Sequence, residues 1–263
     1  MPNEWFQSGH SSPALDRSLQ ELPLVVERTF KQKIQYIPVA INKLIRHVVF
    51  IPSPVFRNSK SDLFRKIPAP QKSVAHKFSE EETLKLVMAA RANSVSVNDL
   101  LLRDLITGVN MWNRLHTNTK GTNIRVTIPV NLRTAIHSKM PARNFVSYVF
   151  LSASAALSGD RMKLLKHVNK FMSSVKKYKL ASLTIEGLSA AIKIPFALKA
   201  TMSPLICHCS ILLSNMGFAL KTSNLPRKSG KIISGNLRLD TFELLPPFRP
   251  RLAGAFGAVN YNN

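Results

Sequence analysis

The sequence predicts an α/β fold, and three features between residues 98 and 152 predict it. Apolar side chains in residues 98–112 recur at spacings of three and four, the period of a helix with one buried face. These side chains are Leu101, Leu102, Leu105, Ile106, Val109 and Trp112. After a polar turn at 117–122, Ile124, Val126 and Ile128 recur with the period of two that indicates a buried strand. Residues 144–152 alternate in the same way and predict a second strand.

Capping signals precede the predicted helix. Ser96 or Asn98 can accept a hydrogen bond from the free amide groups of the first turn, and Asp99 places negative charge where the helix dipole favours it. At the other end of this α/β unit, Pro129 is expected to end the strand, because proline cannot donate to a sheet ladder. The polar pair Asn131 and Arg133 follows, at a strand end where sites commonly lie.

Upstream, residues 19–50 are apolar with scattered lysine and arginine, and Pro23 and Pro38 are expected to divide them into two helical pieces. One apolar stripe comprises Leu22, Val25, Val26, Phe30, Ile34 and Ile37, and a second comprises Ile41, Leu44, Ile45 and Val48. Two interpretations stay open. The stripes pack against the remainder of a domain, or they form a basic amphipathic helix on an anionic membrane surface. Residues 51–75 are expected to be an extended connector.

Two further helices have clear signals. Ser79 caps the first, which runs to residue 91, and its acidic first turn, Glu80 to Glu82, is interpreted as solvated rather than as an acid–base pair. Residues 160–179 form the second, with one apolar face and a lysine face that includes Lys166, Lys170 and Lys177. That face is either simply solvated or binds an acidic lipid, nucleotide or carrier. Residues 185–205 are expected to be helical, with a break at Pro195.

The remaining predicted elements are strands. Residues 209–213 form a buried strand that ends on Ser214, Asn215, Met216 and Gly217. Residues 232–239 and 253–261 form two more, separated by a proline-rich turn with Pro246, Pro247 and Pro250.

Charge is the most unusual property of the composition. The chain of 263 residues carries 37 Lys and Arg against 14 Asp and Glu, a formal net charge of +23. Such a field attracts phosphates on nucleic acid, anionic lipid, coenzyme A or a carrier's phosphopantetheine, and basicity alone does not choose among them.

Cysteine usage and hydropathy set the expected compartment. Cys207 and Cys209 flank His208, but no second ligand pair follows at zinc-like spacing, so no metal site is expected. The two thiols cannot easily close a disulfide from neighbouring alternate positions, which favours a reducing compartment. No leader begins at Met1 and no run of eighteen apolar residues occurs. A cytoplasmic protein is expected, either free or peripheral to a membrane.

Five segments in order carry a family resemblance: SVNDLLL, RVTIPVNLR, RNFVSYVFL, LLSNMG and AFGAVNYNN. Together they resemble the chloramphenicol acetyltransferase-like superfamily, and within it condensation domains and the wax ester synthase group. The resemblance covers about two thirds of the chain and implies a lobe with a mixed sheet flanked by helices. It also implies an acyltransferase, in which a histidine removes a proton from an alcohol or amine that attacks a thioester.

The histidine motif of that family, His-His-x-x-x-Asp-Gly, does not occur in this sequence. The nearest candidate, His10 with Asp16, has the wrong spacing and no following glycine, so no catalytic residue is assigned. By comparison with the family, residues 1–77 correspond to a remnant of the N-terminal lobe helices and a crossover linker. Residues 78–263 then correspond to the C-terminal lobe. The chain is expected to be a fragment or split frame, truncated at both ends and completed by an N-terminal lobe or partner chain, or else a degenerate, non-catalytic member.

The resemblance also implies roles for individual residues. Asn98 and Asp99 match a pair with a structural capping role, and Arg133 matches an arginine that holds the lobes together by bidentate hydrogen bonds. Ser214, Asn215 and Gly217 match a strand end that lines the substrate tunnel, where a hydroxyl or amide can steady an oxyanion. Lys166, Lys170 and Lys177 are expected to receive the phosphates of an acyl-coenzyme A or phosphopantetheine-linked acyl donor, with no resident cofactor.

A second class of function remains beside the acyltransferase. In that alternative the chain is a non-enzymatic basic module that contacts an anionic membrane or nucleic acid, of which nucleic acid is the less favoured partner.

Overall fold

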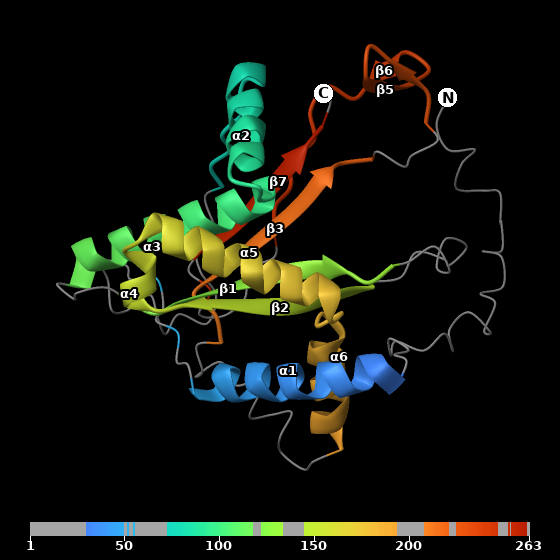
Figure 1. Cartoon of the computed structure of the whole chain (residues 1–263). Coiled ribbons are helices and arrows are strands. Elements are labelled where there is room, and N and C mark those ends of the chain that lie inside the picture. Colours follow the sequence, from blue (N-terminus) through green and yellow to red (C-terminus); the bar gives the residue numbers. More distant parts are fainter. Residues whose placement is uncertain are drawn as a thin grey trace.

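The computed structural model describes residues 30–49, 52, 55, 73–117, 122–133, 145–193, 208–220, 225–246, 252 and 254–261. Its centre is a four-stranded mixed sheet in the order β2–β1–β3–β7, which confirms the predicted α/β class (Figure 1). The strands are β1 (Ile124–Asn131), β2 (Val146–Ala153), β3 (Ile211–Phe218) and β7 (Gly254–Asn260). β2 is antiparallel to β1, whereas β3 is parallel to both β1 and β7.

Two helices, α3 (Val97–Thr117) and α5 (Arg161–Lys177), lie side by side over one face of this sheet (Figure 1). The apolar residues predicted for this core form one buried cluster with the inward residues of β1 and β2. The cluster includes Leu102, Ile106, Val109, Ile124, Val126, Ile128, Val149, Leu151, Leu164, Val168, Phe171, Val175, Ile211 and Leu213. Full burial of each such side chain contributes roughly 1.5–3 kcal/mol, so this layer is the main source of stability.

The opposite face of β1 holds a buried arginine. Arg125 is 2% exposed, and its Nε donates to Ser152 Oγ at 3.1 Å on β2. Its Nη1 donates to the His208 carbonyl oxygen at 3.2 Å, just before β3. The Arg125 carbonyl accepts a hydrogen bond from the Ser210 amide at 2.8 Å. The Arg125 side chain therefore links the start of β1 to the end of β2 and to the segment just before β3.

Side chains from two helices cover the outer edge of β2. Thr184, on α6 (Ser182–Ile192), donates to the Tyr148 carbonyl at 2.6 Å. His167 Nε2 lies 2.9 Å from the Ser152 carbonyl, so it carries the hydrogen of that contact. These carbonyls are four residues apart and point the same way, as alternation along a strand requires. The edge strand thus has part of its unpaired backbone satisfied.

The first helix of the structure, α1 (Phe30–Val49), lies beside α6 near the same edge (Figure 1). Tyr36 donates from its hydroxyl to Glu186 Oε2 on α6 at 2.7 Å. Tyr36 and Ala40 are buried within the main core cluster. Residues upstream of the lobe boundary expected at 77 therefore contribute to the same core as the sheet.

The helix α2 (Glu80–Ala92) begins with the predicted capping box. Ser79 Oγ accepts from the Glu82 amide at 3.1 Å, and Glu82 Oε2 accepts from the Ser79 amide at 2.7 Å. These hydrogen bonds hold the pKa of the Glu82 carboxyl below its usual value. The first-turn carboxylates are exposed, as the solvated interpretation expected.

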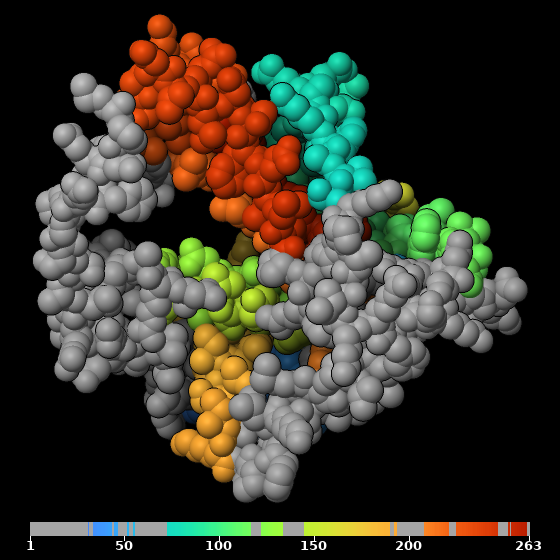
Figure 2. Space-filling view, turned by 180° about the vertical axis from the view of Figure 1, so that it is seen from behind, coloured from blue at the N-terminus to red at the C-terminus, as the bar shows by residue number. Residues whose placement is uncertain are grey.

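Two short elements were not predicted. The helix α4 (Ala155–Ser158) follows β2 and is capped by Ser154. A separate three-stranded sheet contains β4 (Arg227–Lys228), β5 (Lys231–Ser234) and β6 (Leu237–Arg238). Figures 1 and 2, which view the molecule from opposite sides, show this sheet and α2 protruding at the same end.

The single strand predicted over 232–239 is wrong, because β5 and β6 form a hairpin. Gly235 and Asn236 make its turn, and Gly235 has a φ of +55°, in the left-handed region that glycine adopts at low cost. Glycine followed by asparagine between two strands is a two-residue hairpin signal, so the sequence contained the information.

The expected break at Pro38 is also wrong, since α1 continues through it. Proline removes one backbone hydrogen bond and strains the preceding turn, at a cost of about 3 kcal/mol. Tyr36 and Ala40, on either side of Pro38, are both buried in the core, and this packing keeps the helix continuous across the proline. Pro23 and Pro195 lie outside the described residues.

Pro129 does not end its strand, which continues to Asn131. Arg125 directs both its N–H and its C=O toward Ser210, so residues 125, 127 and 129 point their backbone groups away from β2. On that side, the described part of β1 pairs with β3 only at Val126 and Thr127. The missing donor of Pro129 therefore faces a stretch without a ladder, where proline is tolerated.

Trp112 is not a core residue, contrary to the sequence-based prediction. Its side chain is 48% exposed and stacks on His116, with ring centroids 4.1 Å apart. In this last part of α3 the buried position belongs to Asn113, which donates from Nδ2 to Thr122 Oγ1 at 3.0 Å. The buried residue at the end of α3 is therefore Asn113, which bonds to Thr122, and not Trp112 as the apolar period predicted.

Candidate functional site

Two segments that are far apart in the sequence meet where α3 begins and β3 ends. Asn98, in the first turn of α3, accepts a hydrogen bond at Oδ1 from Asn215 Nδ2 at 3.2 Å, across 117 residues. The structure therefore joins two of the motifs on which the family resemblance rests. We call this contact region, comprising Asn98, Asp99, Ser214, Asn215 and Gly217, the α3–β3 junction.

The end of β3 has a defined, irregular backbone. Asn215 Oδ1 accepts a hydrogen bond from the Gly217 amide at 2.8 Å. Gly217 has a φ of +60°, which favours glycine, and the pairing of β3 with β7 shifts register between Asn215 and Phe218. The asparagine side chain thus fixes the turn of the strand while it also holds Asn98.

Ser214 precedes this irregularity and is half-buried. It pairs with Gly257 on β7, where the chain packs closely against the segment before β7. A Cβ at Gly257 would lie 2.4 Å from the Leu244 carbonyl oxygen. No side chain larger than hydrogen fits there without a shift of the backbone, so Gly257 keeps the strands beside Ser214 in place.

Asp99 forms the buried side of the junction. Only 3% of this residue is exposed, and its Oδ2 accepts from the Ser96 amide at 3.0 Å. Ser96 Oγ accepts from the Asp99 amide at 3.2 Å, so Ser96, one of the two expected caps, is the residue that caps α3. Asn169 of α5 donates from Nδ2 to the same Asp99 oxygen at 3.2 Å. Asp99 Oδ1 is buried and has no hydrogen-bond partner within the described ranges.

Arg133 and Asn131 follow β1, which is parallel to β3, and so lie toward the same end of the sheet as the junction. The Arg133 amide donates to Asn131 Oδ1 at 2.9 Å, and the residue is exposed. The role expected for its guanidinium, holding two lobes together, stays a prediction.

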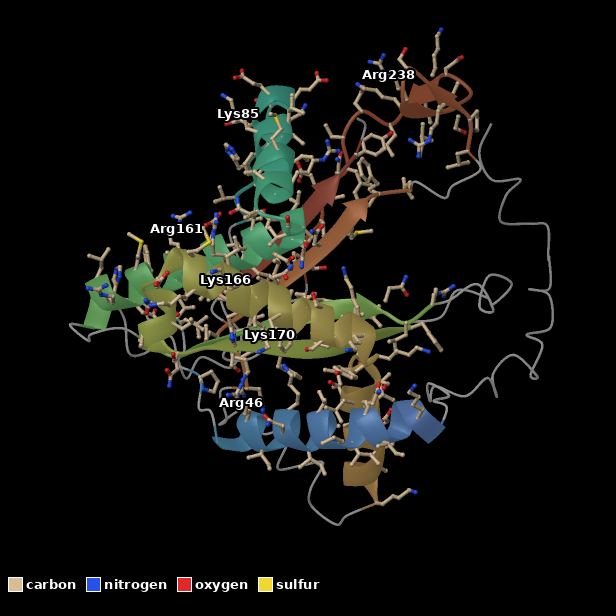
Figure 3. The ribbon with its side chains drawn as sticks, in the orientation of Figure 1. Arg46, Lys85, Arg161, Lys166, Lys170 and Arg238 are labelled. Carbon is tan, nitrogen blue, oxygen red and sulfur yellow. The ribbon has the colours of Figure 1, made fainter. Side chains whose placement is uncertain are left out.

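Lys166, Lys170 and Lys177 are all exposed and share the outer face of α5. Figure 3 shows Lys170 on the edge of α5 nearer to α1, on which Arg46 lies. Lys177 Nζ lies 5.3 Å from the centre of the Tyr178 ring. The contact of α5 with the junction is made instead by Asn169, a residue that the sequence reasoning did not single out. Asparagine within a lysine-rich helix leaves no periodic signal that could have identified it.

Cationic groups gather between α1 and α5. Lys43 Nζ lies 3.8 Å from the centre of the Phe171 ring, and burial, together with the Arg46 charge, lowers the pKa of this lysine to about 8. Burial also lowers the pKa of His167; its hydrogen bond to Ser152 works in the opposite direction, and the charges of Lys43, Arg46 and Lys170 add to the lowering. This region is strongly electropositive.

Only some of the candidate metal-binding and catalytic residues lie within the described part of the chain. Within the described residues no three His, Cys, Asp or Glu side chains form a group that could hold a metal ion. Cys209 is half-buried, whereas Cys207 and the candidate base His10 lie outside the described residues. None of the helices within the described ranges has the length and apolar content needed to cross a bilayer.

Comparison with known proteins gives only distant matches. No family model matches the chain. Two uncharacterized proteins from two strains of Mycobacterium tuberculosis are each 26% identical over 144 residues, which cover 52% of this chain and 34% of the relative. The match therefore spans about a third of the length of these relatives. The epimerization domain from the third module of tyrocidine synthetase B aligns with 77% of this chain and 46% of that chain, at 14% identity and a TM-score of 0.32.

At the junction, Ser214 and Asn215 offer hydrogen-bonding groups. A serine hydroxyl can donate and accept, and an asparagine amide has two N–H donors, of which Asn215 uses one for Asn98. Donors fixed at a strand end can bind a carbonyl oxygen or an oxyanion. Ser214 and Asn215 can therefore orient and polarise a carbonyl group.

Proposed function

We propose that this chain is the C-terminal portion of a thioester-dependent acyltransferase, which transfers an acyl group from coenzyme A or a carrier to an alcohol or amine. The observation that supports the proposal is the hydrogen bond between Asn98 and Asn215. It brings together two motifs that resemble the same family, and it fixes the strand end that the resemblance assigns to the substrate tunnel.

In this proposal Ser214 and the second Nδ2 hydrogen of Asn215 act on the developing oxyanion of the thioester carbon. Loss of one such donor costs roughly 100- to 1,000-fold in kcat in enzymes that depend on it. Asp99 and Asn169 hold the start of α3 and so support Asn98 indirectly. The base that activates the acceptor is supplied by another segment or chain that carries the His-His-x-x-x-Asp-Gly motif.

The exposed lysines of α5 are proposed to attract the phosphates of the acyl donor. Each exposed pair contributes only about 0–1 kcal/mol, because water and salt screen it. Lys166, Lys170 and Lys177 together would therefore raise the encounter rate more than the final affinity.

The test has two arms. The chain alone, incubated with acyl-coenzyme A substrates of several chain lengths and a panel of alcohols and amines, should give no transfer above the uncatalysed rate. If the chain alone shows turnover and the His10→Ala variant loses it, the chain carries its own catalytic base and this part of the proposal is wrong. In the second arm, a chain carrying the histidine motif and found adjacent to this reading frame is added. Transfer should then appear, and Ser214→Ala should lower kcat at least 100-fold while leaving complex formation intact.

The alternative function, a non-enzymatic basic module, is supported by the net charge of +23. Coenzyme A and random-sequence duplex DNA are compared as ligands for the chain and for the triple variant Lys166→Ala, Lys170→Ala and Lys177→Ala. Tighter binding of DNA that the triple variant abolishes would favour the basic module. Salt-sensitive binding of coenzyme A that the same variant weakens would favour the acyl donor.

A further inference from the structure

The outward face of α1 carries an apolar stripe that no other part of the described structure covers. Four isoleucines, at spacings of three, four and four, are each more than half exposed. They are Ile34 (57%), Ile37 (53%), Ile41 (52%) and Ile45 (57%). The opposite side of the helix is the one that packs, through Tyr36 and Ala40. The helix is therefore apolar on two faces and uses only one of them for the core.

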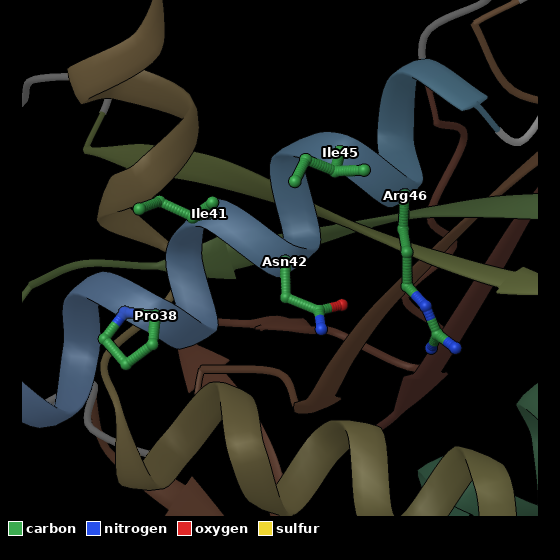
Figure 4. A pocket seen from close by; sticks show the side chains of 5 residues that line it. All are labelled: Pro38, Ile41, Asn42, Ile45 and Arg46. Carbon is green, nitrogen blue, oxygen red and sulfur yellow. The ribbon is translucent and has the colours of Figure 1, made fainter.

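A polar and cationic row runs along one flank of this isoleucine stripe. Lys31, Gln35, Asn42 and Arg46 are all exposed and repeat at helical spacings. A shallow hollow on this part of the helix is lined by Pro38, Ile41, Asn42, Ile45 and Arg46 (Figure 4). Apolar and cationic side chains thus share a single concave surface.

Charge of one sign continues from α1 onto the neighbouring helix. Neither α1 nor α5 contains an aspartate or glutamate. Arg46, Lys166 and Lys170 project from the two helices on the same side of the molecule (Figure 3). Burial is the main cause of the lowered pKa values of Lys43 and His167, and the positive charge of Arg46 lowers both further.

We infer that α1 is a docking helix for an anionic phospholipid bilayer surface, with the isoleucine stripe at the boundary between head groups and acyl chains. Arg46 then contacts lipid phosphates from the flank. An amphipathic helix with exposed branched apolar residues and a cationic border is the arrangement that lies in the plane of a membrane. Basic residues near an anionic leaflet add electrostatic attraction.

Two other occupants fit these observations less well. Proteins bind nucleic acid through cationic side chains and through aromatic side chains that stack on bases. Four exposed isoleucines would gain little from such a contact. A second copy of the chain would bring two acid-free cationic helices together, and like charges at short range oppose that contact. An anionic bilayer can bury the isoleucine stripe and also bind the cationic side chains beside it. The inference does not depend on acyl transfer, because it concerns α1 and not the α3–β3 junction.

The experiment measures co-sedimentation of the full chain with vesicles of phosphatidylcholine containing 30% phosphatidylserine, and with pure phosphatidylcholine. Binding should be strong to the first and at least tenfold weaker to the second. The double variant Ile41→Ser and Ile45→Ser should lower the apparent affinity for the anionic vesicles at least tenfold. Arg46→Gln should lower it about three- to fivefold. Both sets of side chains are exposed, and circular dichroism checks that the variants remain folded.

Matched controls lie on other surfaces. Leu115→Ser removes an apolar side chain of α3 that is even more exposed (78%), and Lys228→Gln removes one positive charge from β4. Both should bind within twofold of the unaltered chain. The inference fails if Leu115→Ser weakens binding as much as the isoleucine variant, or if the anionic vesicles do not bind. It also fails if the chain is a dimer that the isoleucine substitutions dissociate, since a second copy would then cover the stripe.

Discussion

Asn98 and Asn215 are joined by a hydrogen bond of 3.2 Å, so the first turn of α3 and the end of β3 form one structural unit. Asn215 also holds the Gly217 amide, which couples the position of α3 to the left-handed turn of the strand. A change at either asparagine is therefore expected to reach the other segment.

The first prediction concerns this pair. Asn98→Ala should lower the free energy of unfolding by about 0.5–1 kcal/mol, the usual net value of one hydrogen bond, and Asn215→Ala by about 1–2 kcal/mol, because it also removes the acceptor of the Gly217 amide. The double variant should show a coupling of about 0.5 kcal/mol, because both single changes remove the same contact. Urea denaturation measures all four chains. Asn42→Ala, combined with Asn98→Ala, is the control and should be additive; equal coupling in both combinations would argue against the contact.

The second prediction compares two carboxylates of α3. Asp99→Ala leaves the Ser96 amide and Asn169 Nδ2 without their shared acceptor at a buried position, and should cost about 2–3 kcal/mol. Asp104→Ala removes exposed ion pairs with Arg103 and Arg161, and should cost less than about 1 kcal/mol. Similar losses from both substitutions, measured by thermal unfolding, would mean that the buried network is not formed.

Two glycines should respond to alanine in opposite directions. Gly257→Ala places Cβ 2.4 Å from the Leu244 carbonyl, so the backbone beside Ser214 has to move, at a cost of about 3 kcal/mol. Gly108 lies within α3 with open space around its Cα, and Gly108→Ala should stabilise the chain by about 0.5–1 kcal/mol. Amide exchange at β3 and β7 should accelerate only in the Gly257 variant, and unchanged exchange there would show that the strands do not pack as described.

Lys43 predicts a dependence of stability on pH. Its pKa is lowered from 10.5 to about 8, so the unfolded chain binds this proton more tightly than the folded chain. The cost to stability is therefore complete below pH 8, shrinks as the pH rises, and vanishes above 10.5. The shift corresponds to about 3 kcal/mol at most, and partial solvation of the amine reduces this to about 1–2 kcal/mol.

Lys43→Met should accordingly raise the free energy of unfolding by about 1–2 kcal/mol at pH 7 and by much less near pH 10.5. Urea titrations of both chains across this range give the difference directly, because the other titrating groups are common to both. Lys166→Met, at an exposed lysine of α5, should change stability by less than about 0.5 kcal/mol at either pH. A Lys43→Met gain that is independent of pH would indicate that packing, not charge, is responsible.

Periodicity predicted much of this fold because the elements bury one face each. The spacing of Leu102, Ile106 and Val109 located α3, and the alternation in β1 and β2 located both strands and their inward residues. The errors have local causes. Pro38 and Pro129 are tolerated because of what surrounds them, and the turn at Gly235 and Asn236 divides a segment whose apolar pattern resembles one strand.

The junction could be predicted only in part. Asn98 and Asn215 were singled out through the motifs that contain them, but no pattern in the sequence indicates that their side chains meet. Asn169 and Arg125 were not identified at all, because a polar residue that bonds across 70 or 83 positions has no period. Such contacts depend on how the strands and helices are placed relative to one another, which the apolar pattern constrains only coarsely.

The order of the strands also determines the order in which the sheet can be assembled. β1 and β2 are near neighbours in the chain and pair antiparallel, whereas β3 joins β1 in parallel through contacts such as Arg125 with Ser210, 85 residues apart. Long-range pairing pays its loop-closure entropy before it gains contacts, so the layer of α3, β1, β2 and α5 is expected to fold before β3 and β7 are added.

Pulse-labelled amide exchange during refolding should thus protect residues 124–128 before 211–213, and the reverse order would exclude this sequence of events. The α3–β3 junction then exists only once the slowest strands are in place. Mild denaturant should disrupt the junction while most of the helical signal persists, so any binding at Ser214 would be lost before the chain unfolds.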